Sequence, residues 1–246
     1  MSPVLKLVAL AALLAISPVR ALADPGYYVV TAYDNEGVRT LDMRYWTVKS
    51  PGSDATLWPE IGLGYGVTSR WYTEVFAGFI GDAGSAQKLS SLNWQNEVLL
   101  TRGQYPFDLA LHASVIRTYG YSEGNALEIG PVLQTEVGRT QLNANLFVER
   151  AWSADGPQQP TRMKYQWQVR HHGAPLLNVG MQGFGELGTW DDWSARANQS
   201  HRAGPALFGT WRLAAGHVLQ YQAALLFGST YGQNGKMFST RVQYGF

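Results

Sequence analysis

The feature that most constrains the fold is a repeated alternation of apolar and polar residues. It runs in segments of about ten to twelve residues, separated by Gly, Pro, Asn, Asp and Ser. A period of two is typical of strands with two different faces, and little helical periodicity accompanies it. No apolar stretch reaches the roughly 18 to 20 residues of a spanning helix. In hydrocarbon only a closed sheet pairs every backbone N–H and C=O, so the pattern predicts an all-β fold, a transmembrane antiparallel up-and-down β-barrel.

We expect about twelve crossing strands, an even number that suits a bacterial single-chain barrel. Their expected bounds are 38–49, 56–67, 70–80, 88–101, 106–118, 125–137, 139–150, 161–171, 175–188, 202–213, 217–228 and 236–246.

The connections between these segments alternate in length. Tight ones lie near Ser69, Gly103, Gly138, Gly173 and Ala215. Longer ones pass through Gly52, Gly84, Glu123, Asp155, Asp192 and Gly232. Short turns face the periplasm in such barrels and long loops face outward. Twelve crossings that start from the periplasm then return the C-terminus to the periplasmic side.

The alternation also predicts which side chains face lipid. In the last strand we expect Phe238, Val242, Tyr244 and Phe246 outward, with Arg241 and Gln243 inward. In the strand before it we expect an outward row of Leu219, Tyr221, Ala223, Leu225 and Phe227 against inward Gln220 and Gln222. In the sixth strand the outward row is Leu127, Ile129, Leu133 and Val137, against inward Glu128, Gln134 and Glu136.

Tyr and Trp cluster near the expected strand ends. Tyr45, Trp58, Tyr119, Trp152, Trp190 and Trp193 lie near the outer ends, and Trp71, Tyr105, Trp211 and Tyr244 near the periplasmic ends. Rings with one polar edge suit the headgroup level of a membrane. The alternative is a soluble β-protein in which these rings pack a core. Strand length and the two chain ends favour the membrane barrel.

The N-terminus has the pattern of a secretory signal peptide. Lys6 precedes an apolar run from Leu7 to Ile16, and Ala21-Leu22-Ala23 forms a small-residue cleavage site before Asp24. We expect cleavage after Ala23, so that residues 1–23 are removed, 24–36 form a periplasmic lead-in and 37–246 form the barrel. Residues 27–33 also read as a strand, either a lead-in or an extension of the first strand.

Composition excludes several classes of function. Removal of residues 1–23 takes away Lys6 and Arg20, and the formal charge falls from +1 to about −1. No basic excess remains that would indicate a nucleic-acid partner. The chain has no cysteine, so neither a disulfide framework nor thiol chemistry is available.

The C-terminal segment from Phe238 to Phe246 alternates up to a terminal aromatic residue. It resembles the C-terminal strand that the outer-membrane barrel assembly machinery recognises. Tyr244 and Phe246 are the expected assembly signal. This implies a location in the bacterial outer membrane, with outer-membrane lipids and the assembly machinery as partners.

A second resemblance rests on residues 59–71, a glycine-rich strand, a tight turn and an aromatic-led return strand. This stretch resembles the opening hairpin of small outer-membrane transporter barrels, among them the family associated with the phenol meta-cleavage pathway. The resemblance implies a barrel and a role in transport, and it assigns no functional residues.

The same parity places charged side chains in the lumen. The expected acidic set is Asp42, Glu60, Glu74, Glu97, Asp108, Glu128, Glu136, Glu149 and Glu186, and the basic set is Arg44, Lys164, Arg170, Arg212 and Arg241. Because unpaired charges are costly to desolvate, these groups must bond one another or line water. The two alternatives are a narrow, mildly cation-favouring pore and a packed barrel with a structural charge network.

An enzymatic alternative rests on His112 and Ser114, which lie on one face of a strand with Glu123 or Glu128 following. The spacing is similar to the His-x-Ser pair of barrel-borne lipid A deacylases, but Val115 stands where those enzymes have Asn. The local motif of outer-membrane phospholipases is not found. No metal site is expected, because His171 and His172 are adjacent on a strand and point to opposite sides.

These observations favour a passive channel or transporter for small solutes, without cofactor and without catalysis. A non-catalytic structural or surface-interaction barrel is the second reading. A lipid-modifying outer-membrane enzyme is the third.

Overall fold

The structure is a computed structural model, and it describes residues 27–32, 36–49, 52, 54–120, 123–153, 159–174, 176–230 and 233–246. The predicted signal peptide 1–23 and its cleavage site lie outside the described residues. So do residues 24–26 and 33–35 of the predicted lead-in.

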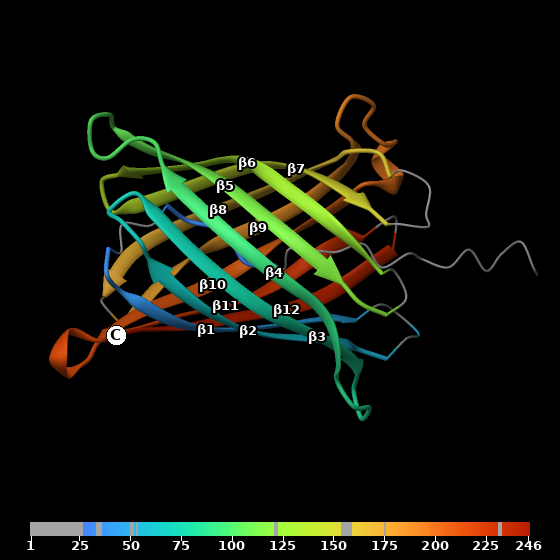
Figure 1. Cartoon of the computed structure of the whole chain (residues 1–246), viewed down its shortest axis with the longest axis horizontal. Coiled ribbons are helices and arrows are strands. Elements are labelled where there is room, and N and C mark those ends of the chain that lie inside the picture. Colours follow the sequence, from blue (N-terminus) through green and yellow to red (C-terminus); the bar gives the residue numbers. More distant parts are fainter. Residues whose placement is uncertain are drawn as a thin grey trace, which may run out of the picture.

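Twelve antiparallel strands form one closed barrel, in which each strand pairs with its neighbour in sequence and β1 pairs with β12 (Figure 1). The strands are β1 Arg39–Lys49, β2 Thr56–Gly66, β3 Trp71–Asp82, β4 Lys88–Leu99, β5 Phe107–Thr118, β6 Gly124–Val137, β7 Thr140–Trp152, β8 Arg162–Ala174, β9 Leu177–Thr189, β10 Ser200–Arg212, β11 Val218–Thr230 and β12 Gln233–Gly245. The predicted twelve-stranded up-and-down barrel is confirmed.

The described connections include two short 3-10 helices, Arg196–Asn198 before β10 and Ala214–Gly216 before β11. None of the helices in the described part of the chain is long and apolar enough to cross a membrane.

The connections separate into two ends of the barrel, which we call the turn end and the loop end. The turn end holds the connections around residues 67–70, 100–106, 138–139, 174–176 and 213–217, together with Phe246. The loop end holds the connections that follow β1, β3, β5, β7, β9 and β11. Figure 1 shows the C-terminus at the left, beside the connection before β11.

Side chains alternate between the lumen and the outer wall along each strand. In β1, Asp42, Arg44 and Trp46 are buried inside the barrel, whereas Met43 between them is 46 % exposed. The faces predicted for β6, β11 and β12 are the faces observed, with Leu127, Leu225 and Phe238 exposed. The period of two therefore separates an apolar exterior from a largely polar interior.

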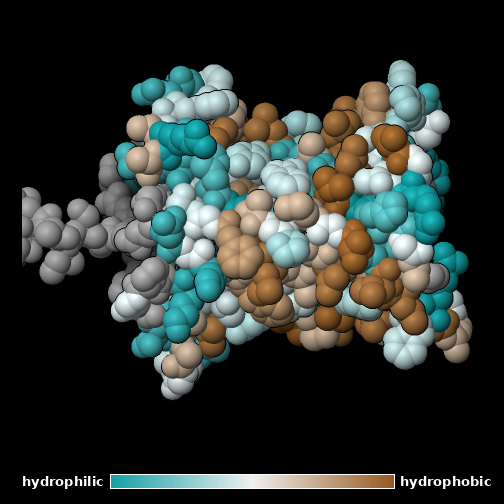
Figure 2. Space-filling view, turned by 180° about the vertical axis from the view of Figure 1, so that it is seen from behind, coloured by the Kyte–Doolittle hydropathy of each residue, from teal (hydrophilic) through white to brown (hydrophobic). Residues whose placement is uncertain are grey.

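The outer wall is a belt of exposed hydrophobic side chains. Figure 2 shows these side chains over the middle of the barrel and hydrophilic ones toward both ends. Two outward aromatic rings lie flat over glycines of the neighbouring strand, Trp167 over Gly183 and Tyr165 over Gly185. A Cβ at Gly183 would lie 2.3 Å from the Trp167 ring, so only glycine allows this smooth apolar surface.

Most aromatic residues predicted near the membrane interfaces are exposed, including Trp71, Trp152 and Trp211. The prediction for Trp58 is wrong. Trp58 faces the lumen, where its ring stacks on that of Trp46 with centroids 6.2 Å apart and an interplanar angle of 9°. The reason is strand parity, because Trp58 is two residues from the inward-facing Glu60.

The periplasmic lead-in is also corrected for the residues that are described. Residues 27–32 lie inside the barrel rather than before it, and the side chains of Tyr27 to Val30 are all buried. They do not extend β1 either, because β1 begins at Arg39 and these residues pack inside the closed sheet. We call residues 27–32 the luminal segment.

Candidate functional site

The luminal segment runs along the lumen, from the loop-end half of the barrel to the turn end. Tyr27 packs against Trp46 and Phe184, which lie near the loop-end limits of β1 and β9. Thr31 and Ala32 line an opening at the turn end together with Phe246. The segment therefore occupies much of the length of the lumen.

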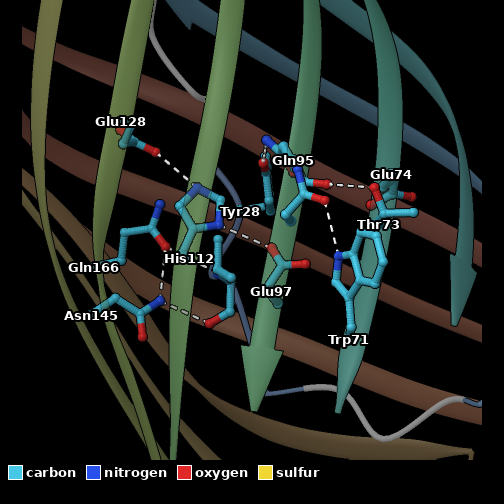
Figure 3. Close-up of polar contacts among 12 residues, drawn as sticks. Tyr28, Trp71, Thr73, Glu74, Gln95, Glu97, His112, Glu128, Asn145 and Gln166 are labelled. Atoms are coloured by element: carbon cyan, nitrogen blue, oxygen red, sulfur yellow. Dashed lines mark hydrogen bonds and ion pairs between the residues drawn. The ribbon is translucent and has the colours of Figure 1, made fainter. Parts of the chain in front are cut away.

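Side chains of the barrel wall satisfy the backbone of this segment. The backbone N–H of Val30 donates to Oε1 of Gln166 at 3.0 Å, and Nδ2 of Asn145 donates to the backbone oxygen of Val30 at 2.8 Å (Figure 3). The hydroxyl of Ser239 donates to the backbone oxygen of Tyr27. Buried backbone groups need such partners, and here amides and a hydroxyl replace a neighbouring strand.

The side chains of the segment alternate between two walls of the lumen. Tyr27 and Val29 pack on an apolar wall built from β1, β9, β10, β11 and β12, which includes Phe208 and Leu226. Tyr28 and Val30 point the other way, against a cluster from β4 to β7 that includes Phe147. This alternation is typical of an extended chain, and here it follows a bend at Tyr27 and Tyr28.

The ring of Tyr28 lies on the guanidinium of Arg44. The Cζ atom of Arg44 is 3.5 Å from the ring centroid of Tyr28 and 3.5 Å from that of Phe76 on its other side. Phe76 in turn lies over Gly62 of β2, where a Cβ would be 2.3 Å from the ring. Gln95 Nε2 donates to the hydroxyl of Tyr28 at 2.5 Å. Since a desolvated cation–π contact contributes about 2 kcal/mol, this stack is a strong anchor.

Asp42 connects two arginines beside this stack. Its Oδ2 accepts from Arg44 Nη2 at 3.0 Å and from Arg241 Nη2 at 2.6 Å. Arg44 also lies 3.1 Å from Glu74 Oε2, and its Nη1 is 4.0 Å from Glu60. The charges of the first, second, third and last strands thus compensate one another in the interior.

A second charge cluster surrounds His112. Its Nδ1 lies 3.0 Å from Glu97 Oε1, and its Nε2 lies 3.3 Å from Glu128 Oε1 (Figure 3). Lys164 is 3.7 Å from Glu128 and 2.7 Å from Glu149. Both ring nitrogens of His112 are directed at carboxylates, so this geometry does not prepare a base for Ser114. The Ser114 hydroxyl is buried and has no hydrogen-bond partner among the described residues.

The other residues predicted to line the lumen divide into an inner set and a rim set. The structure places Glu60, Glu74, Glu97, Glu128, Glu149, Lys164 and Arg241 in the buried interior, together with Asp42 and Arg44. Asp108, Glu136, Arg170, Glu186 and Arg212 lie near the strand ends and are partly or fully exposed. The two charge clusters collect the inner set, and the rim set lies outside them.

Several inward side chains were not predicted. Arg202 is buried beside Tyr27, with 5.6 Å between its Cζ and the ring centroid. Asn145, Gln166 and Gln95, which hold the luminal segment, were not predicted either, because nothing local distinguishes an amide that binds the segment from other polar residues. Strand parity contained the signal, since Asn145 and Gln166 alternate with outward apolar residues in β7 and β8.

Described residues line a cavity at each end of the barrel. One of about 330 Å³ opens at the turn end, between Thr31, Ala32, Gln220 and Arg170. The other, of about 260 Å³, lies at the loop end and includes Arg162 and Glu186. In the described ranges of the chain, no three His, Asp or Glu side chains come together in a way that could hold a metal ion.

Known structures share this architecture. An outer membrane channel from Pseudomonas putida F1 is similar over 92 % of this chain and 100 % of its own, with a TM-score of 0.62 and 12 % identity. The NanC porin is similar over 84 % of this chain and 98 % of its own, with a TM-score of 0.55 and 10 % identity. No protein-family model matches the chain, and no curated protein matches it by sequence. The likeness is therefore one of fold.

Proposed function

We propose that the protein is a passive channel for small solutes in the bacterial outer membrane, and that the luminal segment occludes it at rest. The observation that carries the proposal is an extended segment lying along the axis of a closed barrel with an apolar outside. A purely structural barrel has no need of a chain segment held by dedicated amides. The similar folds of an outer membrane channel and a porin support the same function.

The turn end faces the periplasm in this proposal, and the loop end faces the outside. Tyr244 and Phe246 then lie at the periplasmic end, where the barrel assembly machinery would bind them, and outer-membrane lipids surround the apolar belt. The cavity at the turn end is the periplasmic vestibule, and the luminal segment closes its inner end.

The lumen favours cations over anions. Among the buried side chains of the described residues, carboxylates of Asp and Glu outnumber the ammonium and guanidinium groups of Lys and Arg. Pores lined with an acidic surplus attract cations and repel anions. Solutes pass without a cofactor.

The protein acts without catalysis in this proposal. The candidate hydrolytic pair is His112 with Ser114, and the carboxylates of Glu97 and Glu128 lie 3.0 and 3.3 Å from the two ring nitrogens of that histidine. We also propose a relationship to the family associated with the phenol meta-cleavage pathway. Its support here is the stretch 59–71, which forms the end of β2, a tight turn and the start of β3.

Single-channel recording in planar bilayers tests the proposal. The comparison is between the mature protein and a segment variant, the full mature chain with Tyr27→Ser, Tyr28→Ser, Val29→Ser and Val30→Ser. We expect brief, small conductance steps from the native protein and long, larger steps from the segment variant. A control with Trp190→Ser and Trp193→Ser, both exposed at the loop end, should behave like the native protein.

Two outcomes would contradict the proposal. If the native protein and the segment variant are both silent although folded, the barrel is structural. If both conduct equally, solutes pass without displacement of the luminal segment and the occlusion is refuted.

A further inference from the structure

The barrel wall recognises the luminal segment in the way that proteins recognise extended peptides. Peptide sites of this kind bind the main chain by hydrogen bonds and receive alternate side chains in separate pockets. Both features are present here. Gln166 and Asn145 bind both backbone groups of Val30, and Ser239 binds the backbone oxygen of Tyr27.

The pockets are specific in shape and chemistry. The pocket for Tyr27 is apolar and aromatic, with ring centroids of Phe184 at 5.3 Å and Trp46 at 6.5 Å. The pocket for Tyr28 ends in Arg44 and in the amide of Gln95. The pocket for Val29 is apolar, and Val29 is only 1 % exposed.

These contacts do not depend on the covalent link between the segment and β1. All of them reach across the lumen, from β1, β4, β7, β8, β9 and β12. A free peptide with the same order of side chains would meet the same partners. The partners favour an aromatic pair followed by β-branched residues, and the cations among them, Arg44 and Arg202, lie against the rings of Tyr28 and Tyr27.

We propose that the lumen is a binding site for short extended peptides with adjacent aromatic and β-branched residues, a site that the protein's own luminal segment occupies at rest. The claim that the channel carries such peptides rests on the proposed function, because these peptides are then the solutes that compete with the segment. The claim that the lumen binds them requires no conduction.

Tethering predicts that the native protein binds such peptides weakly. A segment attached by a short linker has an effective concentration on the order of millimolar, so a free peptide must exceed that concentration to replace it. Removal of the four side chains in the segment variant relieves this competition.

The test uses a dye-labelled peptide with the sequence of residues 27–32 and a control peptide of the same composition in reversed order. Fluorescence anisotropy in detergent measures their binding to the native protein and to the segment variant. We expect the segment variant to bind the forward peptide at least ~10-fold more tightly than the native protein does, and ~10-fold more tightly than it binds the reversed peptide.

A second substitution in the segment variant tests the backbone contacts. Gln166→Leu removes the acceptor for the Val30 N–H and should weaken forward-peptide binding by about 5-fold or more. Gln222→Leu is the matched control, because Gln222 also faces the lumen but has no hydrogen bond or ion pair to the segment. It should leave the affinity unchanged.

Hydrogen exchange of the native chain gives a test that does not depend on folding of the segment variant. Excess forward peptide should speed exchange in residues 27–32, and excess reversed peptide should not. Equal effects of the two peptides on hydrogen exchange would overturn the peptide site. So would a result in which neither peptide changes exchange in the native protein and neither binds the segment variant.

The failure of this inference differs from failure of the channel. Specific binding with a silent bilayer would retain the peptide site and refute conduction. Conduction by the segment variant without discrimination between the peptides would retain the channel and refute the site.

Discussion

The guanidinium of Arg44 is held between the rings of Tyr28 and Phe76, with 3.5 Å from its Cζ to each ring centroid. One ring belongs to the barrel wall and the other to the luminal segment. The buried cation of the first strand therefore has one face supplied by the wall and one supplied by a segment outside the sheet. Loss of Tyr28 exposes a guanidinium that the fold otherwise desolvates.

Tyr28→Ala should raise the open fraction of the channel more than ~10-fold. The substitution removes a buried aromatic side chain, which costs about 3 to 5 kcal/mol in a packed interior, and the segment loses its main anchor. Tyr28→Phe should have a much smaller effect, since it keeps the ring and loses only the bond from Gln95, about 1 kcal/mol. Planar-bilayer recording measures both, and equal effects of the two substitutions would show that the ring stack is not the anchor.

Asp42→Asn should destabilise the barrel by roughly 3 to 5 kcal/mol. The carboxylate of Asp42 is fully buried and accepts from both Arg44 and Arg241, so its loss leaves two buried guanidinium groups without their shared anion. Urea unfolding in lipid vesicles measures the change. Glu136→Gln, at an exposed rim position of β6, should cost little, and a comparable loss there would contradict the buried network.

Leu225→Arg should destabilise the barrel by about 2 to 4 kcal/mol if its side chain meets the bilayer midplane, because the charge would enter hydrocarbon. Leu225 is 53 % exposed on the outer wall of β11. Gln220→Arg, on the same strand, faces the cavity at the turn end and should be tolerated. Vesicle unfolding experiments compare the two, and the reverse order of costs would mean that lipid contacts the other face.

Purified native protein should release no fatty acid from phospholipid or lipid A. The ring nitrogens of His112 face Glu97 and Glu128, so no base is directed at the Ser114 hydroxyl. Mass spectrometry of lipids incubated with the native protein and with Ser114→Ala provides the measurement. Fatty-acid release that disappears in Ser114→Ala would establish catalysis in place of passive transport.

His112→Leu should reduce stability without any effect on lipid. Removal of the imidazole leaves Glu97 and Glu128 facing each other in the interior, with Lys164 as the nearby cation of Glu128. The free energy of unfolding should fall by a few kcal/mol. Ser114→Ala should change it little, because Ser114 makes no hydrogen bond among the described residues. Similar losses for the two substitutions would contradict the ion-pair role of His112.

The sequence predicted the strands and their faces because lipid and lumen impose opposite demands on neighbouring residues. The last strand illustrates this, with Phe238 outside and Arg241 inside as expected. The alternation along one strand could not predict which buried charges pair with each other. Asp42 and Arg241 are 199 positions apart, and only closure of the barrel brings them together.

The luminal segment was misplaced for a related reason. Its alternation is the same in a strand, a lead-in or a segment inside the lumen, and only the closed sheet excludes a thirteenth strand. The amides of Asn145 and Gln166 serve as backbone partners, but an inward amide in the sequence looks like any polar lumen residue. The position of Trp58 near a strand end indicated the membrane interface. Its place in the alternation of β2, two residues from Glu60, directs its side chain into the lumen instead.

The contact between Asp42 and Arg241 has a consequence for the lifetime of the folded protein. These residues belong to the first and last strands, so their ion pair crosses the seam at which the cylinder was closed. The hydroxyl of Ser239 on the last strand also bonds the backbone oxygen of Tyr27 from inside. Separation of β1 from β12 therefore requires a buried ion pair to break and the luminal segment to lose a hydrogen-bond partner at the same time. Such a barrel should unfold slowly. The lifetime of its folded state should be set by the kinetic barrier to separation of β1 from β12.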